Sequence, residues 1–368
     1  MKIPRISEIA KRSMVKVDPT DFCEARSDLP RISVKFEPCI ALGGGHRQTL
    51  AGAYWPGSQR PYGAQVRRVV LEQGDQLVLH DDRPVKWLPR GWVVLMIPGL
   101  GSCHQSRYMV RIAARLNDCN VRTFRMDHRG VAAGFQLAQR PGHAGRSEDA
   151  LAALQRIEDL CPGSPIVLIG FSMGGNIALK LLGERPDDLP DDLVRAFVVA
   201  PPIDLAECSR KIDARPGRIF QRYFLRHLMR HFRQRRRSIE RVRQLELQRT
   251  PRSIYEFDDQ ITAPLSGYVN ADDYYRQASA KSWLPLINIP TRIVAANDDP
   301  IVPILSLRDV PRSPSTDLVV TESGGHLGYV AAANSDPDRR WLDWRIVEWV
   351  VGAQKLKISA EEDTKWKR

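Results

Sequence analysis

Short segments dominated by apolar residues recur along the chain from residue 92 onward, and they constrain the fold more than any other feature. Strands covered by helices on both faces have this character, because neither face meets water. Stretches of helical character separate the segments, and this alternation is typical of a doubly wound, mostly parallel sheet. We therefore predict an α/β fold with strands over 92–97, 121–126, 166–169, 196–199, 292–295 and 317–320.

Other elements frame this alternation. Ser147-Glu148-Asp149 begins a helix that runs to about residue 160, and further helices are expected over 176–183 and 341–351. Two β-rich runs joined by Gln73-Gly74-Asp75 predict a hairpin over 66–80. The predicted organisation is an N-terminal arm over 1–35, a main domain over 36–352 and a charged C-terminal tail over 353–368.

Roughly 90 residues interrupt the alternation between 202 and 290, and a structureless loop of that length is improbable inside a compact domain. Apolar side chains recur at every fourth position over 220–232 while arginines occupy another face, which predicts a basic amphipathic helix. We interpret the insertion, about residues 203–289, as a helical cap. The apolar positions are Phe220, Phe224, Leu228 and Phe232, and the basic positions are Arg222, Arg226, Arg230 and Arg233.

The net charge of +12 is concentrated in this cap. Between Arg210 and Arg252 there are 15 Lys and Arg residues against 3 acidic ones, a difference equal to the excess of the whole chain. A charge run is usually a solvated face, but a basic amphipathic helix also suits an anionic lipid surface. Nucleic acid is a weaker alternative, because no binding motif accompanies the charge.

The sequence lacks both a spanning segment and a secretory pattern, since no apolar run approaches the ~20 residues that a membrane helix needs. We expect a cytoplasmic protein, with peripheral contact to an anionic membrane through the arginine-rich cap as the open question.

The strongest local signal is Gly170-Phe171-Ser172-Met173-Gly174, a G-x-S-x-G pattern that lies between a predicted strand and a predicted helix. Such a sharp turn forces the serine into a strained conformation, and only small flanking residues let the backbone close. The turn raises the hydroxyl above the sheet edge and directs the amides at the helix N-terminus toward a reacting oxygen. We predict that Ser172 is a nucleophile.

A serine hydroxyl is a weak nucleophile at neutral pH and needs an adjacent base. With this turn, the order along the chain is serine, acid, histidine, and His326 is the only histidine after His231. The acid should follow the preceding strand, where Asp298 and Asp299 both stand. We favour Asp299 for its spacing to Pro303 and keep Asp298 as the alternative.

An oxyanion formed at Ser172 would need two backbone donors. We predict the amides of Met173, directly after the nucleophile, and of Leu100, in the Pro98-Gly99-Leu100-Gly101 loop. His128 follows a strand and is interpreted as part of a structural turn. No cofactor is expected, because the phosphate-binding glycine patterns are absent. No metal is expected at His227 and His231, which lack the intervening Glu of H-E-x-x-H and lie among arginines.

The chain resembles the YheT-like branch of the α/β-hydrolases, a family of serine hydrolases that includes abhydrolase-domain esterases, acylglycerol lipases and phospholipases. The resemblance covers about residues 36 to 352 and implies a triad of Ser172, His326 and one of the paired aspartates. Two departures are Pro98, where a histidine often precedes the oxyanion glycine, and the arginine-rich cap. The matching stretches are Phe36-Glu37-Pro38, Gly45-His46-Arg47-Gln48-Thr49-Leu50, Pro98 to Gly101, His128-Arg129-Gly130, Gly170 to Asn176, Tyr255-Glu256-Phe257-Asp258-Asp259, Asp272-Asp273-Tyr274-Tyr275, Asp298-Asp299-Pro300 and Gly324-Gly325-His326.

These features predict a serine esterase or lipase-like enzyme that cleaves carboxylic esters through an acyl-enzyme. The apolar cap residues suggest a small-molecule ester or lipid with a hydrophobic acyl group. Two alternatives stay open: an acyltransferase that uses the same acyl-enzyme, and a non-catalytic basic protein that binds a membrane or nucleic acid on a hydrolase scaffold.

Overall fold

A computed structural model describes residues 35–54, 63–215, 217–333 and 336–352. The predicted N-terminal arm, apart from residue 35, and the predicted charged tail lie outside these residues. The core is an eight-stranded sheet in the order β1-β2-β4-β3-β5-β6-β7-β8. The strands are β1 (Gln65–Val70), β2 (Gln76–Asp82), β3 (Val93–Ile97), β4 (Arg122–Asp127), β5 (Ile166–Phe171), β6 (Leu193–Val199), β7 (Thr291–Ala296) and β8 (Thr316–Thr321).

The strand pairing confirms a mostly parallel sheet. β1 and β2 form the predicted hairpin, with Gln65 opposite Asp81 and Val70 opposite Gln76. β2 also pairs antiparallel with β4, whereas all pairs from β4 through β3, β5, β6 and β7 to β8 are parallel. The carboxyl ends of the six parallel strands therefore lie at one edge, where α/β proteins bind their ligands.

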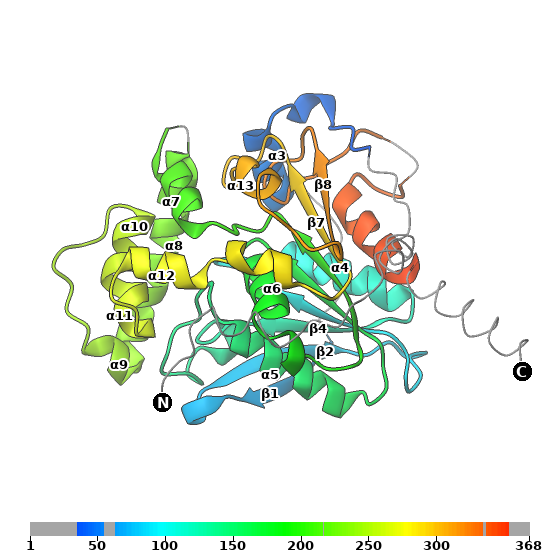
Figure 1. Ribbon diagram of the computed structural model, residues 1–368, viewed down its shortest axis with the longest axis horizontal. Coiled ribbons are helices and arrows are strands. Elements are labelled where there is room, and N and C mark those ends of the chain that lie inside the picture. Colours follow the sequence, from blue (N-terminus) through cyan, green and yellow to red (C-terminus); the bar gives the residue numbers. More distant parts are fainter. Residues whose placement is uncertain (1–34, 55–62, 216, 334–335, 353–368) are drawn as a thin grey trace, which may run out of the picture.

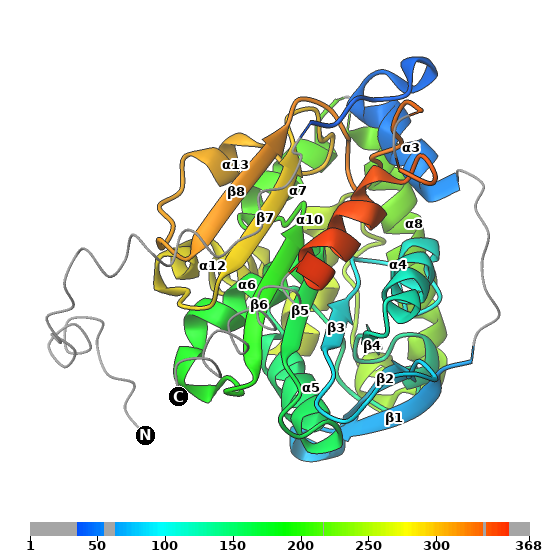
Figure 2. The same ribbon diagram turned by 90° about the vertical axis from the view of Figure 1, so that its right-hand side faces the viewer.

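Helices cover both faces of the sheet, which explains why its strands are apolar throughout. Val94 and Met96 of β3 pack in a core with α4 (Arg107–Asp118) and the helix over 341–352. Leu95 and Ile97 face the opposite side and pack with α5 (Ser147–Leu160) and α6 (Met173–Glu184). Figure 2 shows α4 and the red helix near the C-terminus in front of the sheet, with α5 and α6 behind it.

The insertion between β6 and β7 is helical, and it stands to one side of the sheet in Figure 1. Its helices have a small apolar core that includes Met229, Phe232 and Phe257. The boundaries of the cap, about residues 203–289, stay a prediction. The elements are α7 (Leu205–Asp213), α8 (Arg218–Ser238), α9 (Glu240–Arg243), α10 (Ile254–Phe257), a π-helical turn (Asp258–Thr262), α11 (Ala263–Ser266), α12 (Ala271–Ala278) and a 3₁₀ segment (Lys281–Leu286).

α8 is the predicted basic amphipathic helix. Its arginine face is exposed, and Phe220 and Phe232 on its apolar face are buried, while Phe224 and Leu228 are partly buried. The apolar face therefore packs against the protein. It is not free to insert into a lipid surface, as a membrane-bound amphipathic helix would. Any contact with a membrane would have to use the exposed face.

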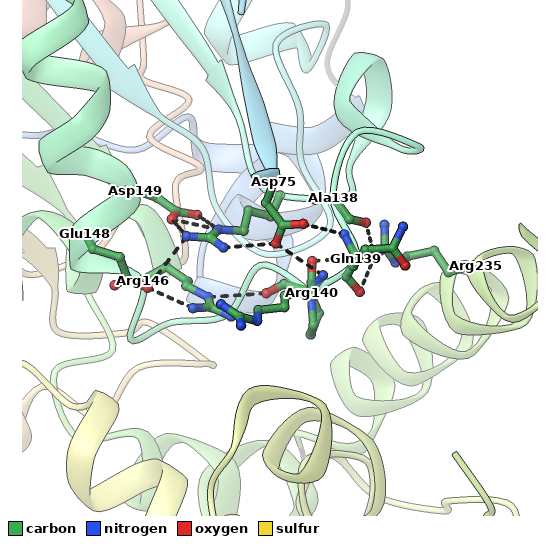
Figure 3. Close-up of polar contacts among 10 residues, drawn as sticks. Asp75, Ala138, Gln139, Arg140, Arg146, Glu148, Asp149 and Arg235 are labelled. Atoms are coloured by element: carbon green, nitrogen blue, oxygen red, sulfur yellow. Dashed lines mark hydrogen bonds and ion pairs between the residues drawn. The ribbon is translucent and has the colours of Figure 1, made fainter. Parts of the chain in front are cut away.

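Two buried arginines hold the loop that follows β4, and one of them, Arg235 of the cap, is labelled in Figure 3. Arg129 donates to Asp149 and Asp75, with Nε to Asp149 Oδ1 at 2.8 Å and Nη1 to Asp75 Oδ2 at 3.1 Å. Arg235 of α8 instead donates to backbone carbonyls, at 2.9 Å to Phe135 and 2.8 Å to Ala138. α8 is thereby fixed to the loop.

No helix within the described residues combines the length and the apolar character needed to cross a bilayer.

Candidate active site

The turn between β5 and α6 holds Ser172 in a conformation that few non-glycine residues adopt, with φ 50° and ψ −119°. A Cβ atom at Gly170 would lie 2.6 Å from the carbonyl oxygen of Gly174, and one at Gly174 would lie 2.3 Å from that of Ile97. Larger residues would therefore push the strand and the helix apart. The two glycines of the motif allow the close packing that presents Ser172 at the N-terminus of α6.

His326 contacts both other members of the predicted triad. Its Nε2 lies 2.8 Å from Ser172 Oγ, and its Nδ1 lies 2.8 Å from Asp299 Oδ2. Because a carboxylate accepts only, Nδ1 carries the proton, and the unprotonated Nε2 accepts from the serine hydroxyl. This is the tautomer that a base for Ser172 requires. The contacts join segments 154 and 27 residues apart in the chain.

The two candidate acids have different partners. Asp299 is 3% exposed, and its Oδ1 accepts from the amides of Ile301 and Val302 at 2.7 and 3.0 Å. These amides orient the carboxylate and leave Oδ2 for His326. Asp298 instead accepts from the Gly325 amide at 2.8 Å, and burial raises its pKa. The structure thus brings Asp299 to the imidazole, whereas Asp298 supports the loop that carries it.

A helix that the sequence did not predict, α3 (Gly45–Tyr54), also holds the histidine loop. The His326 amide donates to Thr49 Oγ1 at 2.8 Å, and Thr49 donates in turn to the Gly45 carbonyl at 2.6 Å. A Cβ atom at Gly325 would lie 2.3 Å from that same carbonyl. Residues 45–50 appeared in the sequence only as part of the family resemblance, and that resemblance was the one signal that marked them.

The predicted oxyanion donors Leu100 and Met173 line the same cavity as Ser172. The neighbouring amide of Gly99 is already engaged, because it donates to the Tyr108 hydroxyl at 3.1 Å. Burial raises the pKa of Tyr108 to about 12, so this hydroxyl stays protonated. The donor role of Leu100 and Met173 stays a prediction.

The other histidines singled out in the sequence have structural contacts. His128 Nε2 lies 2.9 Å from the Pro98 carbonyl, and burial lowers the pKa of this histidine, which favours a neutral ring that donates there. His231 Nε2 lies 2.8 Å from the Gly130 carbonyl. His227 lines the cavity under the cap.

One group within the described residues has potential metal-ligand atoms close together: His80, His104 and Asp127, whose ligand atoms lie within 4.8 Å of one another. Asp127 Oδ2 lies 3.0 Å from His80 Nε2 and 2.7 Å from His104 Nδ1. Burial raises the pKa of Asp127, but hydrogen bonds from both rings outweigh it and the net pKa is lowered. The carboxylate thus has two imidazole partners, and the three side chains form a buried polar cluster. His227 and His231 belong to no such group in the described part of the chain.

Ser172 lies between two cavities. The first, about 210 Å³, extends under the cap and is lined by Phe224, Leu228 and Phe232. The second, about 260 Å³, extends between α3 and the start of α8 and is lined by Leu50, Tyr223 and His326. A molecule that reaches Ser172 can therefore extend into both cavities. We call them the cap cavity and the α3 cavity.

Comparison with known proteins identifies named relatives with similar sequences. The Escherichia coli (strain K12) protein named "Putative esterase YheT" is 34% identical over 232 residues, which cover 61% of this chain and 66% of the relative. The Mus musculus protein "Phospholipase ABHD3" is 28% identical over 241 residues, which cover 64% of this chain and 58% of the relative. The matches thus span less than two thirds of the length of these relatives.

Structure comparison agrees on the fold. Est1E from Butyrivibrio proteoclasticus, solved with ferulic acid bound, has a TM-score of 0.51 and 16% identity, and the match covers 78% of this chain and 99% of that one. At that identity the likeness concerns the fold alone. The family described as "alpha/beta hydrolase fold" matches residues 93–333. The chain therefore belongs to the alpha/beta hydrolase fold family, as a YheT-like abhydrolase-domain protein.

Proposed function

We propose that this protein hydrolyses carboxylic esters through a covalent acyl-enzyme, with Ser172 as nucleophile and His326 as general base. The single observation that carries the proposal is the continuous hydrogen-bonded chain from Ser172 Oγ through both nitrogens of His326 to Asp299 Oδ2, with 2.8 Å at each step. The names of the relatives, an esterase and a phospholipase, support ester chemistry.

In the first half of the reaction, Ser172 Oγ attacks the ester carbonyl carbon while its proton passes to His326 Nε2. Asp299 stabilises the imidazolium and keeps the ring oriented. The amides of Leu100 and Met173 would donate to the negative oxygen of the tetrahedral intermediate. When the intermediate collapses, the ester C–O bond breaks and the leaving alkoxide takes the proton from Nε2.

In the second half, water replaces the alcohol. His326 Nε2 accepts one water proton as the water oxygen attacks the acyl carbon, and the bond to Ser172 Oγ breaks with return of that proton to the serine. The products are a carboxylic acid and the free enzyme. No group beyond these side chains, backbone amides and water is needed for the proton balance.

Labelling with a serine-reactive fluorophosphonate tests this proposal directly. We expect the wild type to label and Ser172→Ala to lose both labelling and roughly 10⁶-fold in kcat, as nucleophile removal does in other serine hydrolases. The exposed Ser238 provides a matched control, because Ser238→Ala should label normally. Equal labelling of wild type and Ser172→Ala would overturn the assignment.

We further infer a preference for a hydrophobic acyl group, because aromatic and aliphatic side chains make up most of the cap cavity wall, among them Phe224, Leu228 and Ile261. Burying each additional methylene there is worth about 0.8 kcal/mol. A panel of p-nitrophenyl esters from acetyl to decanoyl should show kcat/KM rising by severalfold with chain length. A preference for acetyl over octanoyl would contradict the inference.

We infer that the exposed face of α8 makes a peripheral contact with anionic lipid. Its arginines are exposed, and Ile219 and Tyr223 on the same helix are each 56% exposed beside the α3 cavity. Cations and apolar side chains together suit an anionic lipid surface.

Co-sedimentation with vesicles at low and high salt tests this contact. Binding to anionic vesicles should exceed binding to neutral ones, fall as salt rises, and weaken in Arg222→Glu, whereas Arg156→Glu on α5 is the charge-matched control. Equal binding to both vesicle types, or binding to nucleic acid alone, would contradict it.

A further inference from the structure

Two stretches of the family resemblance, residues 255–259 and 272–275, have no part in the triad, yet the structure brings them together. Asp258 begins the π-helical turn and Tyr275 lies on α12, where its hydroxyl donates to Asp258 Oδ2 at 2.8 Å. Asp259 Oδ1 accepts from the Ala271 amide at 3.0 Å, and the Tyr255 hydroxyl lies 3.2 Å from Asp272 Oδ2. Several contacts thus hold the turn against α12.

The meeting point lies on the wall of the cap cavity, the same cavity that contains Ser172. Asp258, Thr262 and Tyr275 all line it, and Asp258 is the single acidic residue in its described lining. The wall is mostly apolar, with Phe257, Ile261 and Leu265 among its residues, and it also includes two arginines and four histidines. A carboxyl group at such a place faces whatever occupies the cavity.

The partners of Asp258 leave its charge unmatched. Oδ1 accepts from Thr262 Oγ1 at 2.7 Å and Oδ2 accepts from Tyr275, whereas a carboxylate can accept about four hydrogen bonds. Within the described residues no Lys, Arg or His forms an ion pair with it, and the acid that acts on it, Asp213, repels it. Burial raises its pKa to about 6, so the group is mostly ionised at neutral pH.

A carboxylate without a cationic partner in a mostly apolar wall is costly unless further donors reach it. The π-helical turn that carries it is a rare distortion that is frequent at functional sites. The rings of Tyr274 and Tyr275 line the same wall, and aromatic faces attract cations. Acceptor capacity, negative charge and aromatic faces together fit a hydrogen-bond donor of neutral or positive charge.

We propose that Asp258, held by Thr262 and Tyr275, is a binding subsite for a hydroxyl or ammonium group on the part of the ester that lies under the cap. The subsite rests on the proposed ester hydrolysis and deepens it. It adds a specificity that an apolar cavity alone would not have: the cavity selects an ester whose hydrophobic portion also carries a polar donor.

Matched ester sets test this subsite. p-Nitrophenyl esters of an eight-carbon acid would end in methyl, hydroxyl or ammonium, and octanoate esters of chain alcohols with the same three ends would place the donor on the other side of the ester. The readout is the ratio of kcat/KM for the polar-ended to the methyl-ended ester. In one of the two sets, Asp258→Asn should lower this ratio by about tenfold to a hundredfold, the value of a hydrogen bond to a charged group.

The hydroxyl and ammonium esters show whether the subsite prefers a neutral or a charged donor. A larger loss with ammonium indicates that charge dominates, and similar losses indicate a neutral donor. Asp259→Asn is the matched control, because Asp259 is the neighbouring acid, is not part of the cavity lining, and should leave every ratio unchanged. Thr262→Val, which removes one hydroxyl partner of Asp258, should lower the ratio by a smaller factor and serves if Asp258→Asn does not fold.

The outcomes separate the two proposals. Absence of Ser172-dependent turnover of any ester would refute the proposed function. Ser172-dependent turnover with identical ratios in wild type, Asp258→Asn and Thr262→Val, in both ester sets, would refute the subsite alone.

Discussion

Arg129, in the loop that follows β4, and Arg235, which contacts that loop from the cap (Figure 3), are both buried, but their charges are stabilised in different ways. Arg129, on the sheet side, pairs with Asp149 and Asp75. Arg235, on the cap side, has carbonyl oxygens as its hydrogen-bond partners, and burial lowers its pKa to about 10. The comparison indicates that the sheet edge matches buried charge with opposite charge, whereas the cap uses carbonyl dipoles at Arg235 and hydroxyl groups at the partly buried Asp258.

This difference has a physical meaning. A buried ion pair that loses one member leaves an uncompensated charge and costs much more than the loss of hydrogen bonds to neutral groups. The sheet edge should therefore be rigid and sensitive to substitution, while the cap should tolerate change and adapt to a ligand.

The largest expected effect lies at the sheet edge. Asp299→Asn should lower kcat by about 10⁴-fold, because the amide would favour the wrong tautomer of His326. Asp298→Asn keeps an oxygen for the Gly325 amide and should change kcat by less than about tenfold. Steady-state kinetics on one activated ester measures both, and equal losses in the two variants would contradict the assignment of the acid.

Arg129→Met should destabilise the protein by about 3–5 kcal/mol, because Asp149 and Asp75 would stay buried without their cation. Urea unfolding at pH 7.5 measures the free energy. Asp149 already has its pKa raised to about 6 by burial, against the lowering effect of Arg129, and loss of the arginine should raise it further. A loss below about 1 kcal/mol would show that the sheet edge does not depend on charge matching.

Asp258→Asn should become more stable relative to wild type as pH rises. The folded pKa of about 6 lies above the ordinary value of 3.8, so the folded state binds this proton more tightly and wild-type stability falls as pH rises from about 4 through 6. The variant lacks this group, and the difference in unfolding free energy should shift by up to about 3 kcal/mol between pH 4 and 7. A difference that stays constant over this range would refute the raised pKa of Asp258.

Arg235→Met should cost least, about 1–2 kcal/mol, since the carbonyls of Phe135 and Ala138 lose donors but no carboxylate loses a hydrogen-bonded partner. Hydrogen exchange should show faster exchange in α8 than in α6. Destabilisation as large as that of Arg129→Met would remove the contrast between the two regions.

The sheet and the serine turn could be predicted because their signals are local. Apolar segments identified the strands of the parallel sheet. The five-residue motif around Ser172 indicated the close backbone contacts, because both Gly170 and Gly174 belong to it. The order of serine, acid and histidine then pointed to His326. The choice between Asp298 and Asp299 was harder, because it depends on a turn in which the amides of Ile301 and Val302 orient one carboxylate.

Contacts between distant segments could not be read from the sequence. Thr49 accepts from the amide of His326, which is 277 residues away in the chain. The helix α3 that carries Thr49 has no strong apolar pattern from which it could be predicted. The periodicity of α8 predicted two faces but not which one packs inward. The link between Asp258 and Tyr275 likewise appears only when the cap helices are assembled.

Phe224 belongs to the walls of both cavities that meet at Ser172. A change in the size of this one ring would therefore alter the room for the acid and for the alcohol of an ester at the same time. Variants at this position should therefore change the selectivity for the acid and the selectivity for the alcohol together. To change only one of them, a substitution at Phe224 would need a second substitution in the wall of the other cavity that restores its size.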